Sequence, residues 1–436
     1  MASFRLGDGF LLGVATAATQ IEGGDSNNNW ADWASRGLIS DGSSPVRAND
    51  HYVRWREDVE LMSSMGLKVY RMGVEWSRIE PEAGRFDEAA MAHYREEIAA
   101  IIAAGMKPLL TLHHFSNPLW FEQMGAFEHS DSVAIFLRFA KAVIRGLGDL
   151  VSEYITINEP NVYATFGYFY GTWPPGQRSF KRAMRVMSRL AECHIRAYEM
   201  IHQVRVDMGF DDSRVSFAHH MRVFDPESPG NPIHHIGAKL TARMFQDIVD
   251  AALMTGDFKL PLRRPRDISR GRYYDFIGIN YYTRSTVRNF GDGVRADAPV
   301  NDLGWEIYPE GLIRCVDAMY KKYHAPIYIT ENGTCDNDDR FRSKYIYEHL
   351  RQIAASDLPI ERYYHWCFCD NFEWVEGEKA RFGLVHIDFE TQKRTPKRSA
   401  EFFRRLIADH GVDEDLYIEF VERQEYSFNT ENSGGE

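Results

Sequence analysis

The chain has 436 residues, a formal net charge of −12 and a hydrophobic content of 44%. This composition is typical of a soluble globular protein, and it excludes a collagen-like, disulfide-framework or mostly disordered chain. The acidic balance gives no general electrostatic reason to bind nucleic acid or an anionic membrane, and no apolar stretch approaches the ~18 residues of a membrane span.

Eight short apolar runs, rich in Val, Ile, Tyr and Phe, alternate with amphipathic helical patterns along the chain. Each run has the length and composition of a β-strand. We predict strands over residues 10–18, 68–76, 107–114, 154–159, 214–219, 275–282, 326–331 and 363–368. The patterns between the runs predict helices over residues 88–104, 132–147, 180–208, 236–254 and 310–323.

This alternation of strands and helices predicts parallel strands joined by crossover helices. Eight such units favour a closed (β/α)8 TIM barrel, an α/β fold with its active site at the C-terminal ends of the strands. An open doubly wound sheet is the rival, but no GxGxxG motif opens a helix after the first strand. We expect a single catalytic domain over residues 1–423 and a polar, disordered tail over residues 424–436.

The first apolar run imitates part of a secretory signal peptide, because Arg5 precedes it and small residues follow it. Against a cleaved leader, Asp8 lies just before the run. We favour a first strand over a leader, and we therefore expect a cytoplasmic protein. The five cysteines agree with a reducing compartment, because their number is odd and no CxxC motif occurs.

Two glutamates stand out among the polar and aromatic residues that follow the predicted strands. Glu159 closes the fourth strand and Glu331 closes the seventh. A single glutamate at a strand end is more often a loop cap or an arginine partner, but two of them amid aromatic residues favour a functional pair. Glycoside hydrolysis needs such a pair: one carboxyl protonates the leaving oxygen, and the other attacks the anomeric carbon or activates water.

Two histidine pairs, His113-His114 and His219-His220, end the third and fifth predicted strands. Neighbouring strand residues point to opposite faces, so only one histidine of each pair can reach the barrel mouth. The HExxH motif is absent, and we expect no metal ion and no other cofactor. Tryptophans near the last strand supply faces on which a neutral sugar can stack.

With these residues in place, the sequence resembles glycoside hydrolase family one, the β-glucosidase-like retaining enzymes, from about residue 10 to about residue 406. The resemblance rests on FLLGVATAATQIEG, YRMGVEWSRIEP, TINEP, DFIGINYYT, YITENG and DNFEW. It implies that Glu159 is the acid/base and Glu331 the nucleophile, with Arg71 and Tyr282 against the nucleophile. It also implies a substrate-binding set formed by Gln20, His114, Asn158, Asn280, Tyr282, Trp366, Glu373, Trp374 and Phe382.

The resemblance further implies an exo-β-glycosidase that removes terminal β-D-glucosyl residues from small β-glycosides or short oligosaccharides through a covalent glycosyl-enzyme. Transglycosylation is a second expected activity of the same site. Phe115 stands where the family commonly has Trp, which removes an indole donor and leaves β-galactosides and β-fucosides as further substrates. The alternative is a catalytically silent sugar-binding barrel, and the oligomeric state is left open.

Overall fold

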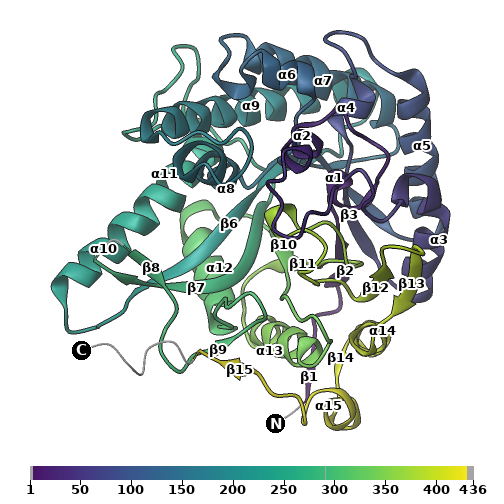
Figure 1. Cartoon of the computed structure of the whole chain (residues 1–436), viewed down its shortest axis with the longest axis vertical. Helices are drawn as coiled ribbons and strands as arrows, with labels where there is room; N and C mark the ends of the chain where they lie inside the picture. The colour runs from purple at the N-terminus through teal and green to yellow at the C-terminus, as the bar shows by residue number, and fades with distance from the viewer. Residues whose placement is uncertain (1–2, 290, 430–436) are drawn as a thin grey trace.

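A closed barrel of eight parallel strands forms the centre of the computed structural model, which describes residues 3–289 and 291–429. The strands pair in chain order, and the last pairs with the first, so that β11 lies beside β2 although they come from opposite ends of the chain (Figure 1). The predicted (β/α)8 barrel and its eight strands are confirmed. They are β2 (Leu11–Ala15), β3 (Val69–Gly73), β4 (Lys107–His113), β5 (Glu153–Asn158), β6 (Arg214–Pro226), β7 (Ile277–Arg288), β10 (Ile327–Asn332) and β11 (Ile360–Trp366).

The barrel strands are buried on both sides, because helices cover the outside and side chains fill the inside. The apolar run that imitates a leader is β2, which pairs with β3 on one side and β11 on the other. At Gly13, β2 and β3 approach so closely that a Cβ on this residue would lie 1.7 Å from the carbonyl oxygen of Val69. Only glycine fits at that point. Because β2 pairs with barrel strands on both sides, the first apolar run is a barrel strand, as predicted.

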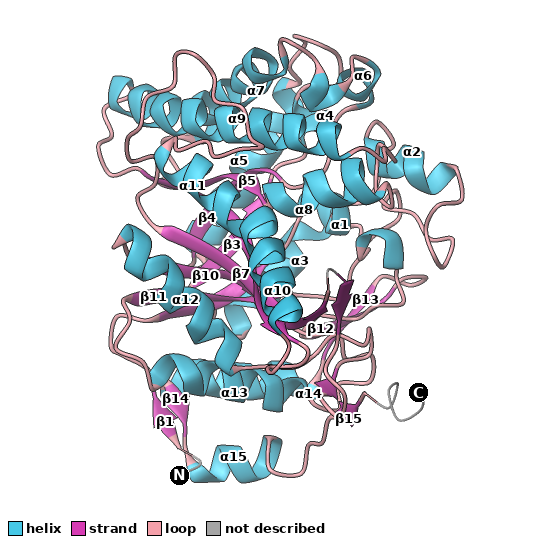
Figure 2. Cartoon of the chain, turned by 90° about the vertical axis from the view of Figure 1, so that its left-hand side faces the viewer, coloured by secondary structure: helices cyan, strands magenta, loops and turns pink. Residues whose placement is uncertain are grey.

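Helices enclose the barrel on its outer side (Figure 2). They bury one apolar stripe each and expose charged residues on the other face. The main ones are α3 (His51–Ser64), α5 (Glu88–Ala103), α7 (Ser132–Leu147), α9 (Phe180–Asp207), α12 (Glu310–Tyr323), α13 (Arg342–Ala354) and α14 (Arg398–Asp409). Shorter helices lie in the connections: α1 (Ala18–Ile21), α2 (Asn29–Ser35), α4 (Trp76–Ile79), α6 (Leu119–Gln123), α8 (Pro160–Ala164) and α15 (Glu414–Phe420).

The helix predicted over residues 236–254 begins earlier and is interrupted. It consists of α10 (Pro232–Ala242), a π-helical turn (Arg243–Asp247) and α11 (Ile248–Thr255). The earlier start has a local cause, since proline is favourable in the first turn of a helix and the side chain of Asn231 caps it by accepting from the backbone N–H of Ile233. The other four predicted helices agree with the structure to within a residue.

Small sheets lie outside the barrel. β1 (Phe4–Arg5) pairs with β14 (Gly411–Val412), and β12 (Val385–Asp388) pairs with β13 (Lys393–Pro396). β8 (Gly291–Gly293) extends the barrel sheet by pairing antiparallel with the end of β7. Among the described residues, no helix combines the length and apolarity needed to cross a membrane. The five cysteines are all buried and none is in a disulfide.

The C-terminal segment corrects the expected domain boundary. β15 (Ser427–Phe428) pairs with β9 (Pro299–Val300). The preceding Tyr426 donates a 2.8 Å hydrogen bond to Glu348 and packs its ring against Phe341. This segment therefore packs against α13 and β9, and the prediction of a disordered tail from residue 424 is wrong for residues 424–429. Residues 430–436 lie outside the described part of the chain.

Candidate active site

The C-terminal ends of the barrel strands bring the predicted site residues into one contact network. Arg71 comes from β3, Asn158 ends β5, Asn280 and Tyr282 lie in β7, and Glu331 lies in β10. Trp366 ends β11, and the other members come from the connections beyond the strands. All of them join the network through hydrogen bonds or ring contacts. They are Gln20, His114, Glu159, Trp366, Glu373, Trp374 and Phe382.

Glu331 is held by one donor on each carboxyl oxygen. Nη1 of Arg71 lies 2.6 Å from Oε1, and the hydroxyl of Tyr282 lies 2.6 Å from Oε2. The side chain of Glu331 is 4% exposed. A buried carboxylate requires this kind of pairing, and a charge-assisted bond from a guanidinium is among the strongest that a protein offers. The arrangement orients Glu331 and favours its ionised form.

Within the described part of the chain, Glu159 accepts two side-chain hydrogen bonds, both on one oxygen. Oε1 accepts from Nδ2 of Asn280 at 2.8 Å and from Nδ1 of His220 at 2.9 Å. The backbone of Glu159 is left-handed, with φ of 41°, and its N–H donates to the carbonyl oxygen of Ala218. A non-glycine residue in this region is strained, and such strain persists where the surroundings over-determine it. Oε2 is left available for a proton or a ligand.

Amide side chains join the two glutamates. Oδ1 of Asn158 accepts from Nη2 of Arg71 at 2.7 Å and from Nδ2 of Asn280 at 3.0 Å. Arg71 also binds Glu331, and Asn280 also binds Glu159. The two carboxyl groups therefore belong to one hydrogen-bond network and influence each other's ionisation.

The electrostatics of this pair depend on the charge of His220. Burial raises the pKa of Glu331 to about 7, against the opposing effect of Arg71 and with a contribution from the negative charge of Glu159. Burial also raises the pKa of Glu159, but a positively charged His220 and the hydrogen bonds from His220 and Asn280 outweigh it and lower that pKa. A positive charge on His220 thus favours the shared proton on Glu331 rather than on Glu159.

A second wall of the site offers polar atoms that have no partner among the described residues. Nε2 of Gln20 binds Glu373 at 3.2 Å, which leaves its buried Oε1 unpaired. Asn158 donates to Nε2 of His114 at 2.9 Å, so that the ring proton of His114 is on Nδ1, which is also buried and unpaired. Unpaired buried polar groups are costly, and a ligand rich in hydroxyl groups would satisfy both.

The surroundings of Glu373 favour the protonated form of its carboxyl group near neutral pH. Burial, followed by the negative charge of Glu331, raises its pKa to about 8, although hydrogen bonds from Trp366 and Gln20 oppose the shift. A neutral carboxyl group can donate one hydrogen bond and accept another. It can therefore bind two neighbouring hydroxyl groups of a sugar.

Aromatic rings complete the enclosure. His114 stacks against Trp366 and Trp374, with ring centroids 5.7 and 5.9 Å away. Phe382 packs against Tyr282 at 6.4 Å. Phe115 is 3% exposed and lies edge-on to Trp374 at 5.3 Å. Stacked and edge-on rings of this kind form a rigid apolar surface between the polar groups.

A cavity of about 440 Å³ opens at the mouth of the barrel beside Glu373 and Trp374. Trp173, Trp305 and Arg222 are among the residues that line it. It is large enough for the part of a substrate that extends beyond one sugar ring.

Sequence reasoning missed His220 and Arg222. The alternation rule that places one histidine of each pair in the mouth is confirmed, because His114 and His220 contact the site, whereas His113 binds Asn117 instead. The rule alone could not select which member of a pair faces inward.

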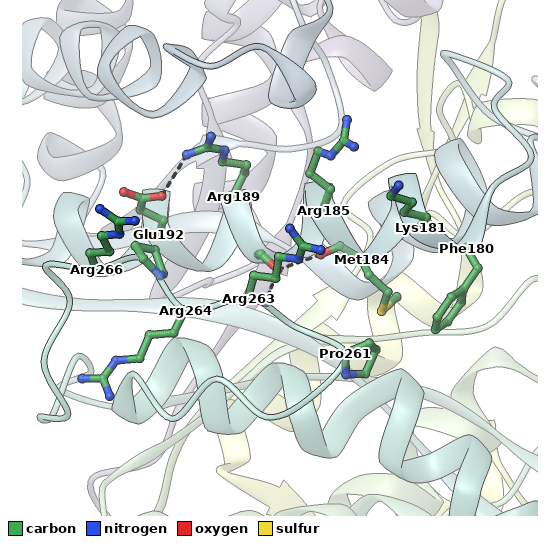
Figure 3. Close-up of a pocket in the computed structure, with 12 residues that line it drawn as sticks. Phe180, Lys181, Met184, Arg185, Arg189, Glu192, Pro261, Arg263, Arg264 and Arg266 are labelled. Atoms are coloured by element: carbon green, nitrogen blue, oxygen red, sulfur yellow. Dashed lines mark hydrogen bonds and ion pairs between the residues drawn. The ribbon is translucent and has the colours of Figure 1, made fainter.

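A different hollow, of about 640 Å³, lies between α9 and the segment that leads into β7 (Figure 3). It shares no lining residue with the mouth cavity. Its walls carry one carboxylate, Glu192, and six cations: Lys181, Arg185, Arg189, Arg263, Arg264 and Arg266. The acidic protein therefore has a basic groove that is separate from the candidate active site.

The sequence is similar to those of known glycoside hydrolases, which agrees with the paired glutamates of the site. Residues 2–412 match the sequence profile of glycosyl hydrolase family 1. The chain is 30% identical to β-glucosidase A of Thermotoga maritima, covering 93% of this chain and 98% of that protein. It is 29% identical to a β-galactosidase of Saccharolobus solfataricus, covering 95% and 96%.

The fold agrees as well. The structure of a β-glycosidase from Pyrococcus horikoshii superimposes with a TM-score of 0.87 at 32% identity, covering 97% of this chain and 100% of that one. The family profile spans all eight barrel strands and both glutamates. The chain therefore belongs to glycosyl hydrolase family 1, and it is a glycoside hydrolase of the β-glucosidase and β-galactosidase type.

Proposed function

We propose that the protein is a retaining exo-β-glycosidase that releases terminal β-D-glucosyl residues from small β-glycosides or short oligosaccharides. The observation that carries the proposal is the unequal setting of the two glutamates. Glu331 has a donor on each oxygen, which suits an ionised nucleophile, whereas Glu159 keeps one oxygen free, which suits a proton donor.

In the first step, a carboxylate oxygen of Glu331 attacks the anomeric carbon while Glu159 transfers its proton to the glycosidic oxygen. The bond between the anomeric carbon and that oxygen breaks, and the aglycone leaves as an alcohol. Arg71 and Tyr282 hold the attacking group in place, so that little reorganisation is needed during the reaction. The sugar is then joined to Glu331 as an ester.

In the second step, the ionised Glu159 takes a proton from water, whose oxygen attacks the anomeric carbon and displaces Glu331. Esterification removes the negative charge of Glu331, and with it the repulsion that disfavours ionisation of Glu159. The same group can therefore serve as the acid first and the base afterwards. Two inversions at one carbon return the original β-configuration.

The polar wall supports a neutral sugar in the glycone position. Gln20 supplies an unpaired acceptor, His114 an unpaired donor, and Glu373 a carboxyl that both donates and accepts. The similarity to relatives named β-glucosidase and β-galactosidase supports a site that accepts more than one sugar. A silent sugar-binding barrel is not favoured, because both carboxyl groups keep the partners that catalysis needs.

The proposal is tested by following hydrolysis of an aryl β-glucoside with proton NMR. We expect β-glucose to appear first and to mutarotate afterwards; α-glucose as the first product would contradict retention. Addition of methanol should yield methyl β-glucoside, the product of transglycosylation. A protein that binds glucosides without turning any of them over would support the silent barrel.

The role of Glu159 has its own test, since general acid catalysis typically contributes ~10²–10⁴-fold. Glu159→Ala should lose activity of that order on alkyl glucosides, whose leaving groups need a proton, and far less on dinitrophenyl glucoside. An equal loss on both substrates would mean that Glu159 is not the proton donor.

A further inference from the structure

Two residues in the middle of β6, His220 and Arg222, extend the contacts of Glu159 into a short series of hydrogen bonds. Nε of Arg222 lies 3.0 Å from Nε2 of His220, and Nδ1 of His220 lies 2.9 Å from Oε1 of Glu159. Residues two apart in a strand project to the same side, which is why both can face the barrel mouth. His220 is 6% exposed, and Arg222 is partly buried at the edge of the mouth cavity.

These contacts determine where the protons of the imidazole are. A guanidinium nitrogen can only donate a hydrogen bond, so Nε2 of His220 must accept and cannot carry a proton. The ring is therefore neutral, with its single proton on Nδ1, and that proton is donated to Glu159. Because Asn280 also donates to Oε1, the acidic proton of Glu159 is confined to Oε2.

The charged groups around Glu159 make its ionisation depend on the protonation state of His220. Glu159 faces the cation Arg71 and the carboxyls of Glu331 and Glu373. A positive charge on His220 would lower the pKa of Glu159, whereas burial raises that of Glu331 to about 7. The proton would then move from the acid to the nucleophile, and both would be in the wrong state for the first step.

Neighbouring groups hold the side chains of His220 and Arg222 in position without competing for the contact between them. The ring of His220 stacks on Tyr282, with centroids 6.0 Å apart and planes 16° from parallel, and contacts the edge of Phe245. The backbone N–H of Arg222 donates to Gln246. Nη1 makes only long bonds, at 3.4 Å to Ser285 and 3.5 Å to Asp292, so the shortest contact of the guanidinium is the one to His220.

We propose that Arg222 is a positioning residue for the acid/base: it keeps His220 neutral and directed at Oε1, and thereby retains the proton of Glu159 on Oε2 for transfer to the leaving group. The inference rests on the proposed role of Glu159. Arg222 acts through His220, and it needs no contact with the glycosidic oxygen.

Arg222→Gln removes the obligatory donor, so that Nε2 can take up the proton that Glu159 should hold. We expect the optimum of kcat/KM for an alkyl glucoside to move to lower pH by about one unit or more, with a fall in rate at neutral pH. The loss should be small for dinitrophenyl glucoside, which needs no proton donor. Arg222→Lys, whose ammonium group also only donates, should restore part of the wild-type profile.

The double variant His220→Asn/Arg222→Gln separates this role from contacts with the aglycone. Asparagine does not titrate, so adding Arg222→Gln to His220→Asn should leave the pH optimum unmoved, even if KM changes because Arg222 lines the mouth cavity. Arg288→Gln is the matched control: it removes the same charge from β7 at an exposed ion pair with Glu227, and its profile should equal that of the wild type.

Two failures are distinguishable. If Glu159→Ala reduces alkyl and dinitrophenyl glucosides equally, the proposed function fails and this inference fails with it. If Glu159→Ala behaves as a lost acid but Arg222→Gln leaves the pH optimum in place, or shifts it equally in the His220→Asn background, this inference alone is overturned. Thermal unfolding of each variant, which should match the wild type, confirms that the comparison is made between folded proteins.

Discussion

Nη1 of Arg71 lies 2.6 Å from Oε1 of Glu331, and the two side chains are 0% and 4% exposed. Water cannot compensate the charge of Glu331 at this depth, so its ionised form depends on the guanidinium of Arg71. Removing one partner of such a buried pair is far more costly than removing an exposed one. The pair therefore links the stability of the barrel to the reactivity of its proposed nucleophile.

Arg71→Met should raise the pKa of Glu331, since the guanidinium is the largest influence that lowers it. The nucleophile must be ionised to react, so the acidic limb of the kcat/KM profile should move to higher pH, by about one to three units. Arg71→Lys should move it less, because an ammonium group keeps the charge but not the fork of donors. An acidic limb that stays in place in Arg71→Met would contradict the assignment.

Glu331→Ala should reduce turnover of aryl β-glucosides by ~10⁴-fold or more, because no covalent intermediate can form. Sodium azide is small enough to enter the space left by the carboxyl. We expect it to restore part of the rate on an activated substrate and to give α-glucosyl azide, the product of one inversion. NMR of the azide product is the measurement, and a β-azide or full activity without azide would exclude Glu331 as nucleophile.

Sugar preference should be loose. Phe115 packs against Trp374 and offers no hydrogen-bond donor where the family commonly has an indole, while Glu373 both donates and accepts. We expect kcat/KM for aryl β-galactoside and β-fucoside within ~10³-fold of the β-glucoside, a difference of about 4 kcal/mol. Phe115→Trp should widen the gap if the missing donor is the cause. A strict preference for glucoside in the wild type would count against this reading.

A buried histidine outside the site should make stability depend on pH. His51 lies between Asp58, at 2.7 Å, and Glu97, at 2.9 Å. Burial lowers its pKa, but the two carboxyls outweigh burial and raise the pKa to about 10, from 6.5 in the unfolded chain. Because the folded value is the higher one, this stabilisation is complete below pH 6.5 and is lost as the pH rises through 10.

The free energy of unfolding of the wild type should therefore fall between about pH 6.5 and pH 10 more steeply than that of His51→Gln. Other buried carboxyls, such as Glu122 with its pKa of about 7, titrate in part of this range in both proteins and cancel in the difference. Urea unfolding across the range is the measurement. His235→Gln, at an exposed position, is the control and should follow the wild type; parallel curves for His51→Gln would show that His51 adds nothing.

The eight barrel strands and the two candidate catalytic glutamates could be predicted from the local sequence pattern. The eight strands were visible because each is a short run of residues that favour a buried strand, bounded by turn residues. Glu159 and Glu331 were visible because each ends such a run, and a parallel barrel gathers strand ends at one face. Both predictions use residues that lie close together in the sequence. The relative positions of such residues are set by the side-chain periodicity of strands and helices.

Other features required the closed barrel. Arg71 and Glu331 are 260 positions apart, and Ser427 of β15 pairs with Val300 of β9, 127 positions away. His220 was not selected over His219, because the inward-facing member depends on how β6 is aligned with its neighbours, and that register shifts between Ile155 and Asn158 on one side and between Met221 and Val223 on the other. Hydrogen-bonding partners that lie far apart in sequence are decided by strand register and closure, which no local period encodes.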